Sequence, residues 1–245
     1  MKTRGLSNLR LKVIGLMFVI VSCVGTAFVK KGMPADISQA SLTQLTWSVL
    51  LEAISWIGFP IYAWLLVAGY LHTSSVLKYG VRLLLLGLVA EIPYDLAYTG
   101  KPFDVSSLSS QNPVFALVVI LIVLYALDRF SSRTRGMSIL LGLVVVVAGI
   151  LWMVVFNLGL RLGLMPGGVV MLLFALIFRY LANRENTMNF LGCLVGALIG
   201  IFPAFGLAIL HYHNDELGMG RVGKWFFYAA YPTCLFALGL AGLLS

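Results

Sequence analysis

Charged residues are scarce in this chain, and that scarcity is the first constraint on its fold. Asp, Glu, Lys and Arg make up only 11% of the 245 residues, whereas 60% are hydrophobic and the mean hydropathy is +0.99. Because a soluble domain carries about a quarter charged residues, this composition cannot build a water-exposed surface. The sequence therefore excludes an ordinary soluble domain and predicts a polytopic membrane protein.

Cysteine is also rare, and its few positions argue against disulfide or metal chemistry. Cys23, Cys193 and Cys234 all fall within apolar segments and show no metal-like spacing. They are typical of small residues in helix packing. The polar segment His211–Glu216 has the residue types of metal ligands, but alternation in a loop fixes no geometry. We predict no metal site.

The net charge of +8 does not indicate a nucleic-acid partner. The lysines and arginines stand at the ends of apolar segments, where orientation signals and headgroup anchors belong. The expected partner of the basic residues is the lipid bilayer.

The apolar runs are too long for alternating barrel strands, so the predicted spans are helices. We expect an all-α fold in which residues 1–245 form a single integral membrane domain with about eight transmembrane helices. The predicted spans are residues 12–29, 47–71, 77–97, 113–127, 137–156, 164–181, 188–210 and 225–244. Kinks are expected at Gly58–Pro60 and at Phe202–Ala204, because proline removes a backbone donor.

An even number of spans places both termini on one side of the membrane. Most of the 17 lysines and arginines then lie on the side of the termini. The positive-inside rule predicts that both termini are cytoplasmic.

The stretch Phe59–Tyr98 carries ionisable groups beside or within sequence of membrane depth. Each such group costs about 2.5–3.5 kcal/mol at a helix centre on insertion scales, so its presence needs a reason. The groups are His72, Arg82, Glu91 and Asp95.

Glu91 and Asp95 are four residues apart, which puts both carboxylates on one face of a helix. Paired carboxylates bind a cation, accept a proton or position an amine. The alternative is a helix end whose acids pair with Lys101 or Arg221.

His72 directly follows the second span and is a candidate base or a solvated interfacial histidine. Lys78 and Arg82 lie one turn apart nearby. They suit the phosphates of a nucleotide-bearing cofactor, and they also suit ordinary cytoplasmic anchors.

Several short motifs occur in a characteristic order along the chain. They are Leu11–Ile14 before Gly25, Phe59–Val67 before Gly69–Thr73, Lys78-Tyr79 before Arg82-Leu83, Glu91–Ala97, Asn112 to Phe115, and Phe227-Tyr228 before Tyr231-Pro232. In this order they resemble the TraX family of membrane proteins, named for conjugal pilin N-acetylation, and through it the wider transmembrane acyltransferases.

The resemblance implies acyl transfer, typically of acetyl from acetyl-CoA to an amine or hydroxyl on a protein or glycan presented at the bacterial cytoplasmic membrane. It implies a histidine that acts as base or acyl relay, an acid that orients it, and cations that hold the phosphates. The implied catalytic residues are His72, Glu91 and Asp95, and the implied cofactor-binding residues are Lys12, Lys78 and Arg82.

The chain departs from the family pattern where ionisable residues are expected. Ser22-Cys23 replaces an Asp-His pair, Ala68 a glutamate, Trp56 an arginine and Cys234 a histidine. Cys23 is a conceivable thiol nucleophile. The cation in its span that could activate the thiol is Lys12, which is about three turns away and too far to do so, so we predict an inert thiol.

These departures leave three readings of the function open. One is a membrane acyltransferase. The second is a catalytically inactive family member that acts as a binding or assembly partner. The third is a small transporter that uses Glu91 and Asp95 as a cation or proton site.

Overall fold

The structure, a computed structural model, describes residues 5–26, 41–99, 110–161, 165–214, 216 and 221–244. These residues form ten α-helices and one antiparallel pair of two-residue strands, which confirms the all-α prediction. In chain order the elements are α1 (Asn8–Val24), α2 (Leu42–Ser55), α3 (Gly58–His72), α4 (Val76–Thr99), α5 (Pro113–Phe130), α6 (Arg135–Val155), β1 (Leu160–Arg161), β2 (Met165–Pro166), α7 (Gly167–Leu181), α8 (Glu185–Ile199), α9 (Phe202–His211) and α10 (Arg221–Leu244).

The ten described helices fall on the eight predicted segments, because two segments are each broken in two. The first break is the turn at Trp56-Ile57, between α2 and α3, just before the predicted kink. The second break separates α8 from α9 at Gly200. Its φ is +138°, a backbone conformation that glycine adopts without strain and other residues do not. Pro203 then lies in the first turn of α9, where its missing N–H costs nothing.

Local sequence signals explain where helices begin. At α2, the Ser41 side chain accepts from the backbone N–H of Gln44, and the Gln44 side chain accepts in return from the Ser41 N–H, a complete capping box. At α5, the Asn112 side chain accepts from the Val114 N–H at 3.0 Å, and Pro113 opens the helix. These contacts satisfy donors that have no partner inside the helix.

The helices have the character of a membrane protein. Three stretches of the described chain are long and apolar enough to cross a bilayer: Leu42–His72, Pro113–Phe130 and Arg135–Val155. Shorter apolar helices occupy Gly167–Leu181, Phe202–His211 and Tyr228–Leu244. Large apolar side chains of α6, among them Ile139, Leu143 and Trp152, are exposed, which suits contact with lipid and not with water.

The chain folds into two compact units. The first comprises Met1–Tyr62, Val89–Val105 and Gly196–Ser245, and the second comprises Ala63–Leu88 and Ser106–Val195. Helices α3 and α4 contribute residues to both units.

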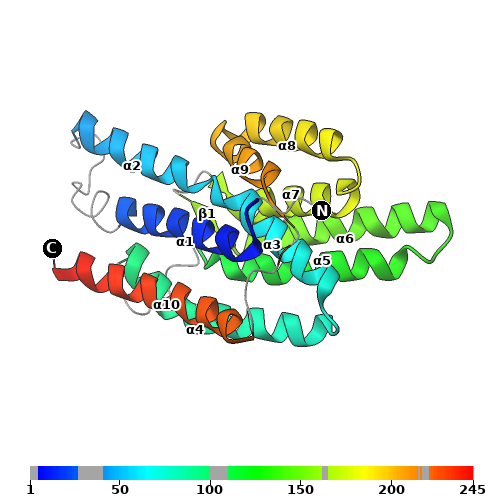
Figure 1. The fold of residues 1–245 in the computed structure, drawn as a ribbon, viewed down its shortest axis with the longest axis horizontal. Coiled ribbons are helices and arrows are strands. Elements are labelled where there is room, and N and C mark those ends of the chain that lie inside the picture. The colour runs from blue at the N-terminus through cyan, green and yellow to red at the C-terminus, as the bar shows by residue number, and fades with distance from the viewer. Residues whose placement is uncertain are drawn as a thin grey trace. The chain divides into compact units, whose positions relative to one another are not determined.

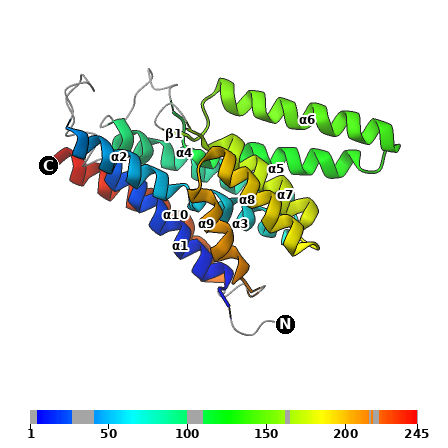
Figure 2. The ribbon, with the colours of Figure 1, turned by 90° about the horizontal axis from the view of Figure 1, so that it is seen from above.

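In the second unit α5 packs against both α6 and α7. Figures 1 and 2 show α5 and α6 running side by side in opposite directions, joined by the turn at residues 131–134. Gly149 of α6 lies so close to α5 that an added Cβ would approach Val123 Cγ2 to 2.7 Å. Small residues of this kind let helix backbones approach within a membrane.

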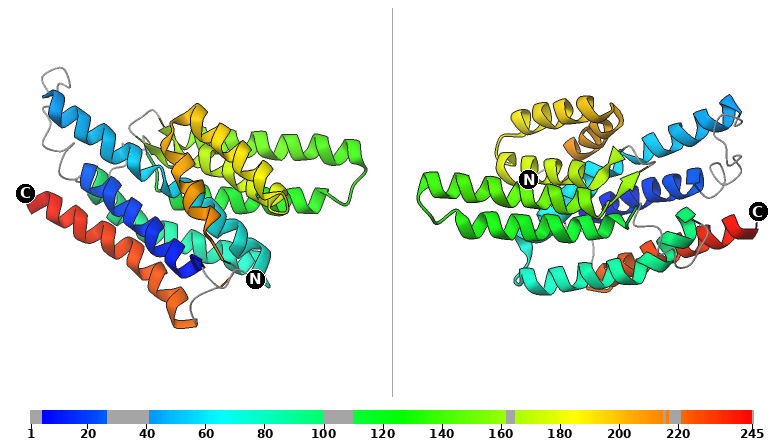
Figure 3. Two further views of the ribbon diagram at one scale, coloured as in Figure 1. Left: turned by 45° about the horizontal axis from the view of Figure 1, so that its top comes forward. Right: turned by 180° about the vertical axis from the view of Figure 1, so that it is seen from behind.

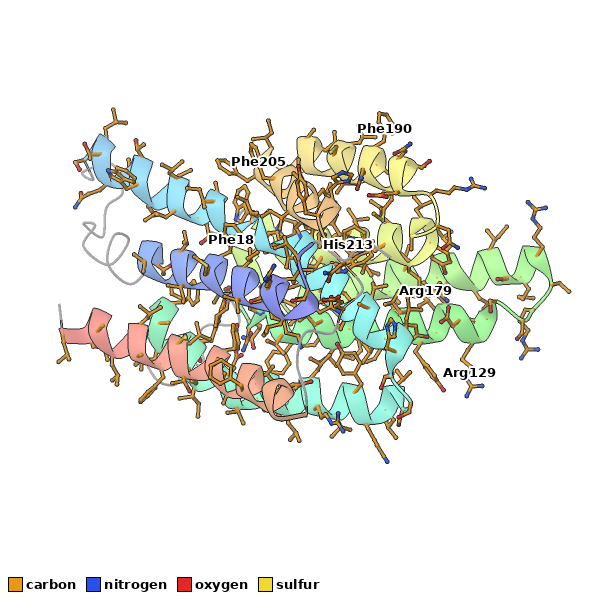
Figure 4. All side chains as sticks on the ribbon, in the orientation of Figure 1. Phe18, Arg129, Arg179, Phe190, Phe205 and His213 are labelled. Carbon is orange, nitrogen blue, oxygen red and sulfur yellow. The ribbon has the colours of Figure 1, made fainter. Side chains whose placement is uncertain are left out.

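One polar contact ties three helices of the second unit together. Asp128 of α5 accepts a hydrogen bond from the Tyr70 hydroxyl of α3 at 2.6 Å and pairs with Arg179 of α7 at 2.9 Å. The neighbouring Arg129 donates instead to Tyr125, one turn back on its own helix. Figure 4 labels both arginines. The pair is partly exposed, so it contributes about 1 kcal/mol or less.

In the first unit α1 packs against α2 and α10, and Figure 3 shows α1 beside α10. A Cβ on Gly25, directly after α1, would stand 3.0 Å from Leu51 Cβ of α2. A Cβ added to Gly200 would contact the ring of Trp56, and one added to Gly206 of α9 would overlap the Ile57 carbonyl oxygen and the Pro60 ring. The α8–α9 break therefore packs directly onto the α2–α3 break.

We expect Gly206→Ala to lower the stability of the protein by about 1–3 kcal/mol, because its methyl group would overlap the Ile57 carbonyl oxygen and the Pro60 ring. The measurement is thermal unfolding of the purified protein in detergent. Gly136→Ala is the matched control, since an added Cβ there meets nothing within 4 Å. Equal melting temperatures for Gly206→Ala and the wild type would show that this contact does not constrain the fold.

Candidate functional site

A buried carboxylate lies at the centre of a polar cluster in the first unit. Glu52 is one turn from the end of α2 and is only 4% exposed. Its Oε2 accepts a hydrogen bond from Ser22 Oγ at 2.8 Å, and its Oε1 accepts one from Trp56 Nε1 at 3.3 Å. A buried acid is costly without such donors, so these contacts hold the carboxylate in place.

Tyr98 extends the cluster from the other side of Ser22. Its hydroxyl oxygen lies 2.8 Å from Ser22 Oγ and 3.7 Å from Cys23 Sγ. The serine hydroxyl has one proton, which it donates to Glu52, so Tyr98 donates to Ser22 and the Cys23 thiol donates to Tyr98. The donors thus form one directed series that ends on the carboxylate.

The cluster is assembled from helix ends. Ser22 and Cys23 lie in the last turn of α1, and Tyr98 is the penultimate residue of α4. Trp56 is the residue that caps α2, where the turn into α3 and the contact with Gly200 fix its ring. Three helices and a helix break therefore define the position of one carboxylate.

Cys23 faces an apolar environment on its other side. It is fully buried, with Tyr94, Ala97 and Leu235, in a hydrophobic cluster against which Tyr98 also packs. An apolar environment does not stabilise a thiolate, and the inert thiol stays a prediction.

The predicted acids Glu91 and Asp95 belong to the same unit as this cluster. Both lie on α4, and Asp95, which is 7% exposed, precedes Tyr98 by three residues on that helix. Lys12 is on α1, ten residues before Ser22, or about 15 Å along the helix. The first unit thus contains both predicted acids and one of the three predicted cofactor-binding residues.

The predicted base and the other two cations lie in the second unit. His72, at the end of α3, is exposed, and its Nδ1 lies 2.7 Å from the Ala68 carbonyl oxygen. Since a carbonyl only accepts, Nδ1 donates in this contact. Lys78 and Arg82 are exposed, one turn apart, near the start of α4. His72 thus belongs to a different compact unit from Glu91 and Asp95.

Glu52 and Tyr98 are the residues that the sequence predictions missed. The sequence did contain a signal, because Glu52 is the only acid in its predicted span and has Ser48 four residues before it and Ser55 three residues after it. That spacing puts three polar groups on one helix face. All three side chains are buried in the structure.

No group of three or more His, Cys, Asp or Glu side chains suited to a metal ion occurs in the described part of the chain. Of the polar segment His211–Glu216, residue 215 lies outside the described residues. His213 instead joins the N-terminal segment, through backbone pairing with Leu6.

The fold and this cluster define an α-helical membrane protein with a buried, hydrogen-bonded pair of a carboxylate and a hydroxyl. The chain belongs to the TraX family: the family model described as TraX protein matches residues 7–242, nearly the whole chain. This match confirms the resemblance found in the sequence motifs. Comparisons with curated proteins and with solved structures give no match.

Most of the positions at which the chain departs from the expected family pattern lie at this cluster. Ser22, Cys23 and Trp56 are part of it, and Cys234 precedes Leu235, which packs beside Cys23. The remaining departure, Ala68, lies on α3 in the second unit.

We expect Tyr98→Phe to destabilise the protein by about 0.5–1.5 kcal/mol, because it removes the hydroxyl between Ser22 and Cys23 from a mostly buried cluster. Thermal unfolding in detergent measures the effect. Tyr212→Phe is the control, because that side chain is 66% exposed. If both substitutions shift the melting temperature equally, the Tyr98 hydroxyl has no role in the cluster.

Proposed function

We propose that this TraX-family protein is a membrane-bound acyltransferase. It moves an acyl group from a thioester donor such as acetyl-CoA to an amine or hydroxyl of a protein or glycan presented at the membrane. The observation that carries the proposal is the 2.8 Å hydrogen bond from Ser22 Oγ to the Glu52 carboxylate, with Trp56 holding the other carboxylate oxygen. A hydroxyl, a base within hydrogen-bond reach and a third group that orients the base are the parts that acyl transfer requires.

The site also suits this chemistry because it excludes water. Ser22 is 1% exposed and Glu52 is 4% exposed. Exclusion of water strengthens electrostatic interactions and protects a reactive acyl group from hydrolysis.

The other predicted residues have supporting roles in this proposal. Glu91 and Asp95 position the acceptor, since they lie on the helix that supplies Tyr98. In the first unit, Lys12 is the candidate ligand for the phosphates of the donor. Lys78 and Arg82 are phosphate-binding candidates of the second unit, a role to which their exposure and spacing are suited.

His72, in the second unit, is the base of an alternative reaction centre. In the neutral ring its Nε2 carries a lone pair at an exposed helix end.

The Ser22–Glu52 pair favours an active enzyme over an inactive scaffold. The resemblance expects an acid and a histidine at positions 22 and 23, and their replacement removes both groups from α1. Glu52 of α2 supplies a carboxylate to the same place. The ionisable group that acyl transfer needs is therefore still present, on a neighbouring helix.

The test uses the full chain, purified in detergent, with radiolabelled acetyl-CoA as the donor and two probe acceptors, glucosamine and a short peptide with a free amine. We expect Glu52→Gln to lower the rate of acetyl transfer by about 100-fold or more, since glutamine keeps the shape but cannot take up a proton. Glu185→Gln, at an exposed position on α8, is the control and is expected to retain the wild-type rate.

Other results would overturn parts of the proposal. If His72→Ala abolishes transfer and Glu52→Gln does not, the reaction centre is at His72. A wild-type protein that consumes no acetyl-CoA is a binding or assembly partner. Proton-dependent uptake by proteoliposomes that is lost in Glu91→Gln would identify a transporter.

A further inference from the structure

We propose that Ser22 carries the acyl group covalently, as an ester on its Oγ, and that Glu52 transfers the proton in both halves of the reaction. This inference rests on the proposed function and deepens it. It assigns the reaction to an acyl-enzyme route, in which the donor leaves before the acceptor reacts.

Three side chains of the cluster are chemically able to accept an acyl group: Ser22, Cys23 and Tyr98. Ser22 Oγ donates a hydrogen bond directly to the base, at 2.8 Å. The Tyr98 hydroxyl is linked to Glu52 through Ser22, and the Cys23 thiol is linked to it through Tyr98 and Ser22. Ser22 is therefore the nucleophile that can lose its proton to the carboxylate in one step.

The surroundings of each candidate support the same assignment. Cys23 lies against the apolar side chains of Tyr94, Ala97 and Leu235, which do not stabilise a thiolate. Ser22 instead has a carboxylate on one side and a tyrosine hydroxyl on the other. These two hydrogen bonds fix the orientation of the Ser22 hydroxyl group, so the group needs little reorientation before it reacts.

In the first half-reaction Ser22 Oγ forms a bond to the carbonyl carbon of the thioester, and the Oγ proton moves to Glu52 Oε2. The carbon–sulfur bond then breaks. The departing thiolate takes the proton from Glu52 and leaves as a free thiol, so the carboxylate is restored. The products are acyl-Ser22 and the thiol form of the donor.

In the second half-reaction the amine or hydroxyl of the acceptor attacks the ester carbonyl and gives its proton to Glu52. The bond between the acyl carbon and Ser22 Oγ breaks, and Oγ recovers the proton from Glu52. Tyr98, which donates to Oγ in the structure, is placed to stabilise the oxygen as it leaves. The enzyme returns to its starting state.

The position of the cluster suits an intermediate that persists until an acceptor arrives. Ser22 is two residues from the end of α1, and Tyr98 is one residue from the end of α4. The ester would thus form close to helix ends, where an acceptor presented at the membrane has a short path. Its burial keeps bulk water from hydrolysing it.

The test begins with the full-length wild-type protein in detergent, mixed with acetyl-CoA and no acceptor. We expect a burst of free CoA thiol that equals the amount of enzyme, followed by slow release. Mass spectrometry of the quenched protein is expected to find acetyl on the peptide that contains Ser22. The modification should survive neutral hydroxylamine, which cleaves thioesters, and should be removed at alkaline pH.

Two variants locate the label on the chain. Ser22→Ala is expected to lose both the burst and the label, and its melting temperature shows whether it is folded. Cys193→Ala, at an exposed position on α8, is expected to behave as the wild type. If Ser22→Ala does not fold, the location of the label in the wild-type protein still decides the question.

The outcomes separate this inference from the proposed function. Acetyl transfer to glucosamine or to the peptide without any label on Ser22 would overturn the acyl-serine and leave the acyltransferase standing. A label that is sensitive to neutral hydroxylamine and lost in Cys23→Ala would assign the nucleophile to Cys23 instead. No consumption of acetyl-CoA by the folded wild type would overturn both proposals.

Discussion

The account depends on one constraint, the need of a buried carboxylate for hydrogen-bond donors. Glu52 lies in the stretch Leu42–His72, which is long and apolar enough to cross a membrane, where an unsatisfied acid would cost several kcal/mol. Ser22 and Trp56 supply the donors, and Tyr98 continues the series beyond Ser22. These hydrogen bonds join α1, α2 and the end of α4.

Packing around the cluster shows how an apolar scaffold positions polar groups. Gly25 lets the end of α1 approach Leu51, next to Glu52, and Gly200 leaves room for the Trp56 ring. A glycine has no side chain to form hydrogen bonds. Both glycines nevertheless allow the close helix packing that sets the distances between the polar side chains of the cluster. Such close approach is the usual basis of helix association in membranes, where burial of apolar surface from water contributes little.

The sequence was sufficient to predict the all-α fold, the eight helical segments and the family, because hydropathy and short motifs are local signals. The predicted kink at Gly58–Pro60 begins two residues after the observed break at Trp56-Ile57, because Pro60 fits within the first turn of α3 and the chain breaks before that helix. The site was not predictable in the same way. Ser22 and Glu52 are 30 residues apart and Ser22 and Tyr98 are 76 apart, so their contacts depend on helix packing that no local pattern encodes.

The hydrogen bond between Ser22 and Glu52 is the central claim, and a double-mutant cycle tests it most directly. The free energies of unfolding of the wild type, Ser22→Ala, Glu52→Ala and the double variant would be measured by denaturation in mixed micelles, since alanine removes the acceptor. The account predicts a coupling energy of about 1–3 kcal/mol between the two positions, as for a buried hydrogen bond to a charged group. Additive effects, with a coupling energy below about 0.5 kcal/mol, would contradict it.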